Sequence, residues 1–150
     1  MNILYAFDPA TGASSPTGFA AFSGKKLYAV EAIVANTIAE MIYQIGKRCV
    51  YEDADYAVEV PEIYPRSPVD PNDMIKIAVV AGACIARAHL PTMYHPKQWN
   101  HGRPKKVTEE RIKRLLTSEE VAMVERVRPA LRNNAWDAVG IGLHHQGRLT

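Results

Sequence analysis

The hydrophobic positions of this chain change along its length from short apolar runs to a helical spacing. Three apolar runs, separated by turns that contain Gly, Pro and Ser, predict strands at residues 2–7, 17–23 and 26–31. Strands that follow one another through such turns pair as hairpins, so we expect these three to form an antiparallel meander.

The next segments alternate between helical and extended patterns. Thr37 and Glu40 form a capping-box pattern before apolar residues at helical spacing, which predicts a helix that ends near Gly46. A strand is predicted at 55–60 and a long helix at 72–89. We expect this second helix to be mostly buried because it contains the apolar residues Ile75, Ile77, Val79, Val80 and Ile85.

A fifth strand is predicted in the apolar stretch PTMYH, at residues 91–95. The polar, Pro- and Gly-containing segment 96–106 is predicted to be a loop. Three more helices are predicted, at about 108–116, 118–128 and 132–146. The pattern therefore indicates one α/β domain over residues 1–150, with a mixed five-stranded sheet flanked by helices: three antiparallel strands, then strands that alternate with helices.

Length and composition fit a single ordinary domain. The chain has 150 residues, 47% of them hydrophobic, which is enough to bury a core. No stretch approaches the roughly 18 apolar residues of a transmembrane helix and the N-terminus lacks a signal-peptide pattern, so we expect a cytoplasmic protein without membrane contact. Cys49 and Cys84 lie outside any CxxC or Cys/His cluster, so we expect two core thiols.

Charge is divided unevenly between the two halves of the chain. Residues 1–75 carry 5 Lys and Arg against 10 Asp and Glu, whereas residues 76–150 carry 13 against 6. A protein that processes phosphodiesters needs acids to hold a cation at the reacting phosphate and bases to bind the neighbouring phosphates. The asymmetry fits such a protein, although charge patterning alone does not define a function.

Three acids stand in otherwise apolar sequence and are candidate metal ligands. Asp8 closes the first predicted strand, Glu59 lies in DYAVEVPE, and Asp137 interrupts AWDAVGIGL, where an unpaired charge would be costly to bury. Two of them also have a purely structural interpretation, Asp8 as a turn or capping residue and Glu59 as a solvent-facing strand residue. The three together favour a metal site, since Mg²⁺ prefers oxygen ligands.

Three segments of the sequence carry a resemblance to a known family. ILYAFDPATGASSPTGFAAF is similar to its opening strand, catalytic aspartate and returning strand, YAVEVPE to its strand-borne glutamate, and NNAWDAVGIGLHH to its final helix. Over nearly the whole chain these segments resemble the RuvC-type Holliday-junction resolvases of the RNase H-like nuclease superfamily. The resemblance implies an RNase H-like fold with a catalytic, metal-binding site formed by Asp8, Glu59, Asn134 and Asp137.

The final helix departs from the family pattern. Two ligating residues stand three positions apart in the family, which here correspond to Asn134 and Asp137, and only one of these is a carboxylate. An amide can hold a cation through its carbonyl oxygen but brings no negative charge. His144 lies on the same helical face and is an assisting candidate, or else a partly exposed helix residue. Glu62, which fits the glutamate motif less well than Glu59, is a further assisting candidate.

The resemblance implies a metal-dependent, structure-selective endodeoxyribonuclease that resolves four-way DNA junctions by paired symmetric nicks. Two Mg²⁺ ions about 3.5–4 Å apart, for which Mn²⁺ can substitute, are expected at the site, with Asp8 bridging them. Two opposed cuts imply a homodimer, and we expect the first turns of helix 72–89 to form its interface. The compact chain suits a bacteriophage version that acts in DNA recombination and repair inside a bacterial or phage-infected cell.

Basic residues concentrate in HPKQWNHGRPKKVTEERIKR, after the fifth predicted strand. Such a segment can bind phosphates, and its candidate DNA contacts are Lys97, Arg103, Lys105, Lys106, Arg111, Lys113 and Arg114. Trp99 is a candidate for stacking on exposed bases, or else a packing anchor. The family also wedges the junction with an aromatic residue after the glutamate-bearing strand, and Tyr64 is the nearest match.

Other functions stay open. A general branched-DNA nuclease that cuts forks or flaps would have the same site. A catalytically inactive junction-binding module would fit Asn134, although Asp8, Glu59 and Asp137 argue against it. An actin-like or sugar-kinase ATPase would also use a hairpin such as the one after Asp8, but it would need a duplicated second domain that 150 residues cannot supply.

Overall fold

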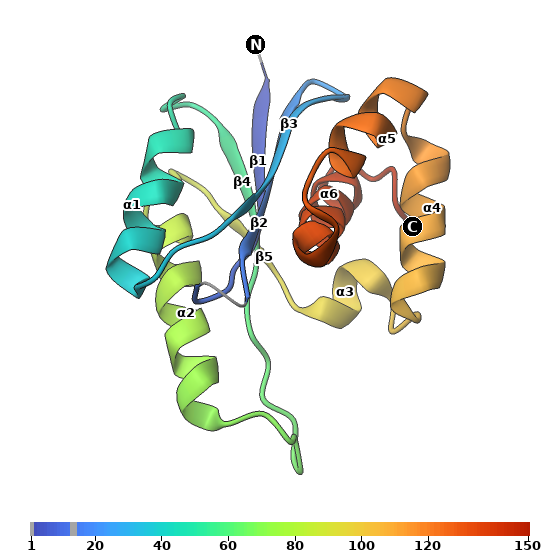
Figure 1. Ribbon diagram of the computed structural model, residues 1–150. Coiled ribbons are helices and arrows are strands. Elements are labelled where there is room, and N and C mark those ends of the chain that lie inside the picture. Colours follow the sequence, from blue (N-terminus) through green and yellow to red (C-terminus); the bar gives the residue numbers. More distant parts are fainter. Residues whose placement is uncertain (1, 13–14) are drawn as a thin grey trace.

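A mixed sheet forms the middle layer of the molecule in the computed structural model, which describes residues 2–12 and 15–150 (Figure 1). Its five strands within these ranges are β1 (Ile3–Asp8), β2 (Thr17–Ser23), β3 (Lys26–Ile33), β4 (Asp55–Glu59) and β5 (Thr92–Tyr94). They lie in the order β3-β2-β1-β4-β5. The β1–β2 and β2–β3 pairs are antiparallel, whereas β1–β4 and β4–β5 are parallel. This topology confirms the predicted fold class.

Helices cover both faces of the sheet. In the described part of the chain they are α1 (Ile38–Arg48), α2 (Pro71–Ile85), α3 (Pro96–Asn100), α4 (Lys105–Leu115), α5 (Ser118–Glu125), the short 3-10 helix η1 (Pro129–Leu131) and α6 (Arg132–His145). α1 and α2 lie on one face, and α3 to α6 lie on the other (Figure 1). None of the helices described is both long and apolar enough to cross a membrane.

Both faces of β1 are buried, which explains its continuous apolar sequence. Leu4 and Ala6 pack in the core beneath α6. Ile3, Tyr5 and Phe7 pack in a second core beneath α1 and α2. Because successive side chains of a strand point to opposite faces, β1 contributes to both cores. A strand of this kind tolerates a charge only at its end, and Asp8 is its last residue.

Glycines allow α6 to approach the sheet closely. Gly18 lies opposite Asp8 in the β1–β2 pair, and a Cβ atom at Gly18 would overlap the main-chain carbonyl oxygen of Asn134. A Cβ atom at Gly142 would likewise overlap the ring of Phe22. The missing side chains therefore set the separation of helix and sheet, and they bring the start of α6 beside the end of β1.

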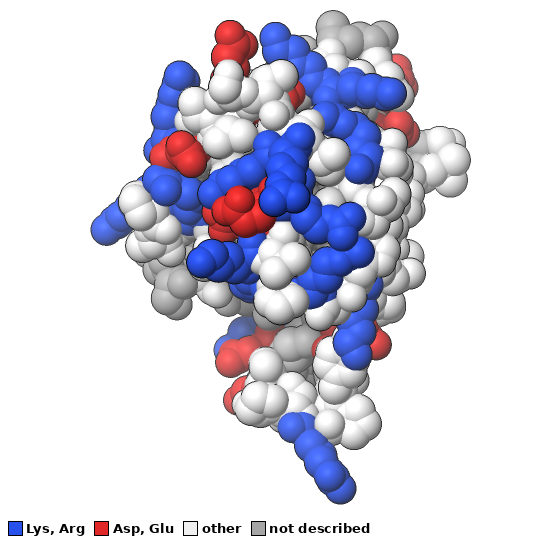
Figure 2. Space-filling model, turned by 90° about the vertical axis from the view of Figure 1, so that its right-hand side faces the viewer, with Lys and Arg blue, Asp and Glu red and all other residues white. Residues whose placement is uncertain are grey.

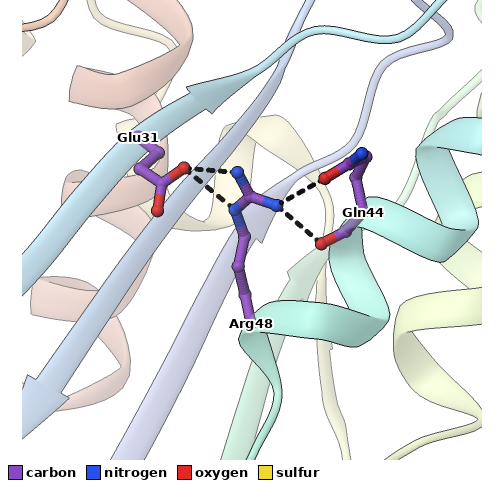
Figure 3. A network of polar contacts seen from close by, with 3 residues as sticks. All are labelled: Glu31, Gln44 and Arg48. Carbon is purple, nitrogen blue, oxygen red and sulfur yellow. Dashed lines mark hydrogen bonds and ion pairs between the residues drawn. The ribbon is translucent and has the colours of Figure 1, made fainter.

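A network centred on one arginine ties α1 to the sheet (Figure 3). The Nε and Nη2 atoms of Arg48 donate to Glu31 Oε2 over 2.9 and 2.5 Å, and Nη1 donates to two oxygens of Gln44. At the other end of α1, Thr37 Oγ1 accepts a hydrogen bond from the main-chain N–H of Glu40 over 3.1 Å, which confirms the predicted cap. Because the Arg48–Glu31 ion pair is partly exposed, it contributes little stability by itself and mainly fixes the direction of α1.

α2 is less buried than its apolar sequence predicted. It ends at Ile85, short of the predicted residue 89, and its buried residues are Val80, Ala81 and Cys84. Ile75 is 60% exposed and Val79 is 49% exposed. The prediction of a mostly buried helix was wrong because α2 packs on the sheet with one side only, so the apolar residues of its other side face outward.

A short helix occupies part of segment 96–106, where a loop was predicted. α3 begins at Pro96, a residue suited to the first turn of a helix, and Gln98 Oε1 accepts a hydrogen bond from the main-chain N–H of His95 over 2.6 Å. Five residues are too few to show a helical spacing in sequence, which is why the prediction failed. α4 then begins at Lys105, earlier than predicted.

We expect Gly18→Ala to destabilise the protein by about 1–3 kcal/mol, because the added Cβ forces α6 away from β2. Denaturant unfolding followed by circular dichroism measures the free energy of unfolding. Gly82→Ala is the control, since its Cβ would meet no atom within 4 Å. The control is expected to be neutral or to gain up to about 1 kcal/mol from higher helix propensity. Wild-type stability in Gly18→Ala would contradict the close approach.

Candidate active site

A cavity of about 350 Å³ lies where β1 and β4 end and α6 begins. Because β1 and β4 are parallel neighbours, their last residues, Asp8 and Glu59, reach the same edge of the sheet. Asn134 and Asp137 stand three positions apart in the first turns of α6, so they share one face of that helix. All four side chains line the cavity. The structure thus brings together the four residues predicted to form the site.

Asp8 occupies the most enclosed position of the four. It is 8% exposed, and Asn134 Nδ2 donates a hydrogen bond to its Oδ2 atom over 3.2 Å. Burial raises the pKa of Asp8 well above its ordinary value, and the charges of Glu59 and Asp137 raise it further. A buried carboxylate next to two others is electrostatically unfavourable, and a bound cation would relieve that repulsion.

Glu59 is held by an aromatic side chain from α3. Trp99 Nε1 donates to Glu59 Oε2 over 2.5 Å. Burial raises the pKa of Glu59 to about 7, and the negative charge of Asp137 adds to this effect, whereas the indole hydrogen bond and the Lys105 ammonium oppose it. The alternative of a fully solvent-facing Glu59 is therefore excluded by its place in the cavity wall.

Asp137 forms an ion pair with the first residue of α4. Lys105 Nζ lies 3.1 Å from Asp137 Oδ2. Burial raises the pKa of Asp137 even though the lysine charge and its hydrogen bond act in the opposite direction. Burial would favour a neutral amine at Lys105, but the charges of Asp137, Asp8 and Glu59 prevail and raise the pKa of Lys105. Lys105 is thus a cation that faces the three carboxylates.

The cavity contains the type of donor atom, oxygen, that a hard divalent cation prefers. Asp8, Glu59 and Asp137 offer carboxylate oxygens, which suit Mg²⁺ or Mn²⁺. Their conformation is not that of a closed metal cage: within residues 2–12 and 15–150, no three His, Cys, Asp or Glu side chains converge closely enough to hold an ion. The Asn134 side chain contacts Asp8 through its amide nitrogen, not through the amide oxygen that could bind a cation. Trp99 and Lys105 instead engage the other two carboxylates.

The two assisting candidates differ in position. Glu62 lines the cavity, and its Oε2 atom accepts a hydrogen bond from the hydroxyl of Tyr64 over 2.6 Å. His144 lies near the other end of α6 and is absent from the residues that line the described cavity. Its Nδ1 atom is 3.1 Å from the carbonyl oxygen of Leu149, and its ring meets that of Tyr94 edge-on. Helical spacing alone therefore did not bring His144 to the three acids.

The Lys and Arg side chains among the predicted DNA contacts form a basic surface beside the cavity. On the face that carries α4, Lys and Arg side chains surround a small acidic group (Figure 2). Arg103 and Lys105 line the cavity itself. Lys97 lies over the ring of Tyr64, with Nζ 4.7 Å from the ring centroid. The remaining members of this surface are the exposed Lys106 and Arg114 and the half-buried Arg111 and Lys113.

Several of these cations already have partners in the protein. Arg103 and Arg111 both donate to the main-chain oxygen of Thr150. Lys113 Nζ lies 2.7 Å from Glu109 Oε1 and 3.9 Å from Glu110 Oε1. Ion pairs of this kind on a surface are weak, so a DNA phosphate can compete for the same cations.

Trp99 does not lie on this basic surface. Its side chain is 3% exposed, so it cannot stack on a DNA base, and the predicted stacking role is wrong for this conformation. The alternative, a packing anchor, agrees with the structure. The hydrogen bond from Trp99 to Glu59 was not predicted, because 40 residues separate the two and no local spacing connects them. The same holds for the Lys105–Asp137 pair, which joins residues 32 apart.

The fold around this cavity is the RNase H-like α/β fold. RuvC from Thermus thermophilus matches the structure with a TM-score of 0.58 and 16% identity, over 96% of this chain and 93% of that chain. T. thermophilus RuvC in complex with a Holliday junction substrate matches with a TM-score of 0.54 and 17% identity, over 99% and 98%. No protein-family model and no curated protein matches the sequence. At these identities the likeness establishes a RuvC-like fold.

We expect the protein without divalent ions to lose stability as pH rises from about 4.5 to about 7. Glu59 binds its proton more tightly when folded, since its pKa rises from 4.5 to about 7. Between pH 4.5 and about 7 the folded state therefore binds more protons than the unfolded state. The stability that this proton contributes is fully present below pH 4.5 and is lost as pH rises through about 7. One pKa unit corresponds to about 1.4 kcal/mol, so the loss is on the order of a few kcal/mol.

Thermal unfolding in chelator at about pH 5 and about pH 8 measures this loss. Glu59→Gln is expected to reduce the difference between the two conditions, since the amide does not titrate. Mg²⁺ is expected to restore stability mainly at the higher pH, where the carboxylates are ionised. Stability in chelator that increases over this range would contradict the electrostatics of the site.

Proposed function

We propose that the protein is a metal-dependent endodeoxyribonuclease that resolves four-way DNA junctions by paired nicks. The observation that carries this proposal is the meeting of Asp8, Glu59 and Asp137 in one cavity at the end of two parallel strands. The basic surface beside the cavity supports a polyanionic substrate. The RuvC-like fold adds support, because one matching structure holds a Holliday junction substrate.

The three carboxylates divide the work at the reacting phosphate. Asp8, the most enclosed of the three acids, would be shared by the divalent ions, and Glu59 and Asp137 would each contribute a further carboxylate ligand. Two Mg²⁺ or Mn²⁺ ions, when bound, supply an activated water and stabilise the charge that develops on the leaving oxygen. Lys105 and Arg103 line the same cavity and can bind the phosphates on either side of the cleaved bond.

A homodimer fits this function, and the exposed apolar side of α2 supports an interface there. Two opposed strands of a junction must be cut symmetrically, which two copies related by a twofold axis achieve. The outward side of α2 presents Ile75 and Val79, which are 60% and 49% exposed, and Leu90 beyond the helix is 80% exposed. Met74 and Ile77 of the same helix line the cavity, so this surface lies close to the site.

One observation favours a second function, a junction-binding module without catalysis. Asn134 replaces a carboxylate and directs its nitrogen at Asp8, while Lys105 already neutralises Asp137. In a protein that no longer binds divalent ions, contacts of this kind would stabilise the carboxylates in place of the ions. Binding and cleavage must therefore be measured separately.

We expect wild-type protein with Mg²⁺ to nick a synthetic four-way junction symmetrically, and Asp8→Asn to lose cleavage by at least about 100-fold while still binding the junction. Denaturing gels locate the nicks, and gel shifts in chelator measure binding. Asp53→Asn changes an exposed acid that precedes β4 and is not among the residues that line the cavity, so it serves as the control with wild-type activity.

The outcomes separate the candidate functions. Equal cleavage of forks, flaps and junctions would identify a general branched-DNA nuclease of the same fold. Tight junction binding without cleavage in either Mg²⁺ or Mn²⁺ would identify the binding module. Neither binding nor cleavage of branched DNA would contradict the proposal altogether.

We expect Val79→Glu to convert the dimer into a monomer, because it places a charge in the apolar surface of α2. Light scattering after size-exclusion chromatography measures the mass. Val50→Glu is the control, since Val50 is 69% exposed and lies outside α2. A monomeric wild type, or a Val79→Glu variant that stays dimeric, would argue against this interface.

A further inference from the structure

The indole N–H of Trp99 is a polar group in the core with a specific partner at the candidate active site. Trp99 is 3% exposed, and its Nε1 atom lies 2.5 Å from Glu59 Oε2. Glu59 ends β4, whereas Trp99 belongs to α3, which follows β5. A contact between such distant segments is made by the tertiary fold and is not a local consequence of the sequence.

Close packing fixes the position of the Trp99 ring. A Cβ atom on Gly140 would lie 2.7 Å from Trp99 Cζ3 and 2.8 Å from Ile112 Cδ1, so the ring rests directly on the backbone of α6. Gly140 follows Asp137 by one turn of the same helix. The same stretch of α6 therefore carries Asp137 and supports Trp99, the side chain that contacts Glu59.

The chemistry of indole restricts what this contact can do. An indole N–H donates one hydrogen bond and accepts none, so Trp99 can neither bind a cation nor take a proton from a reacting group. It engages Oε2 of Glu59, and no hydrogen bond to Oε1 is found among residues 2–12 and 15–150. No buried side-chain nitrogen or oxygen lacks a partner in the described ranges, so Oε1 is open to the cavity that Glu59 lines.

We propose that Trp99 is a positioning residue, which holds Glu59 Oε2 so that Oε1 faces the divalent cation. This inference rests on the proposed function, because it assigns a role at the same metal site. Partners that orient a ligating carboxylate through its second oxygen typically change metal affinity or activity by 10–100-fold when removed. Packing alone would require only a large apolar ring at this position.

Trp99→Phe tests the inference, since it keeps an aromatic ring and removes the N–H donor. Trp136→Phe is a matched control, because Trp136, a residue of α6, is also 3% exposed in the same core as Trp99, and no hydrogen bond from its indole is found among the described residues. Four quantities are measured for both variants: Mn²⁺ affinity by electron paramagnetic resonance, kcat and KM on a four-way junction, and thermal stability.

We expect Trp99→Phe to weaken Mn²⁺ binding by about 10–100-fold and to lower kcat at fixed Mn²⁺, with KM for the junction within about 2-fold of wild type. Trp136→Phe is expected to keep Mn²⁺ affinity and kcat within about 2-fold even where it lowers thermal stability. Equal Mn²⁺ affinity in Trp99→Phe and wild type would overturn the inference. So would a raised KM with unchanged kcat, which would indicate a DNA contact.

The hydrogen bond is tested separately by NMR of the ¹⁵N-labelled protein, in which Trp99 and Trp136 are the two tryptophans. Glu59→Ala is expected to move the indole proton resonance of Trp99 upfield and to leave that of Trp136 in place. An unmoved Trp99 resonance would overturn the contact itself, whatever the activity.

Failure of the proposed function has a different signature. A wild type that binds Mn²⁺ and loses this affinity in Trp99→Phe, but cuts no branched DNA, would overturn the nuclease proposal and retain the role of Trp99. Equal junction cleavage by the wild type and by Trp99→Phe would retain the nuclease proposal and overturn the role of Trp99. A wild type that binds no Mn²⁺ would overturn both.

Discussion

The parallel pairing of β1 with β4 is the constraint on which the rest of the structure depends. It places the last residues of both strands, Asp8 and Glu59, at one edge of the sheet. The side chains that precede these acids are buried on both faces, so the charges can stand only where the strands end. Glycine at position 18 then lets α6 descend onto this edge with Asn134 and Asp137. Backbone geometry, rather than loop conformation, thus assembles the site.

Concentrating three acids in this way has an electrostatic consequence that the surrounding residues partly offset. Burial raises the pKa of each acid, and their mutual repulsion adds to the effect for Asp8 and Glu59. Each acid has one stabilising hydrogen-bond donor. The amide of Asn134 contacts Asp8, the indole of Trp99 contacts Glu59, and the ammonium of Lys105 contacts Asp137. These groups differ in kind, since only the lysine carries charge. The site therefore keeps a deficit of positive charge.

The sequence predicted most of what local patterns encode and little of what depends on long-range contacts. Strand positions, the cap at Thr37 and the four cavity residues follow from apolar runs, capping boxes and motif resemblance. The outward side of α2 was missed because an apolar helix buried on one side has the same composition as one buried on both. Burial of Trp99 was one of two alternatives, but its hydrogen bond to Glu59 was missed because a tryptophan within a basic segment gives no local sign of its partner.

The three compensating groups also determine how readily a cation can enter. The divalent ion of the proposed function would compete with Lys105 for Asp137, but it would not have to displace Trp99, which contacts a single oxygen of Glu59. The Lys105 side chain is 75% exposed, and exposed ion pairs contribute little to stability, so it can leave Asp137 at a small cost in stability. Trp99 is fixed between α6 and Ile112 and has no such freedom. Glu59 is thus held by a rigid partner and Asp137 by an exchangeable one, an arrangement that would let the proposed site accept and release a charged group without a change of shape.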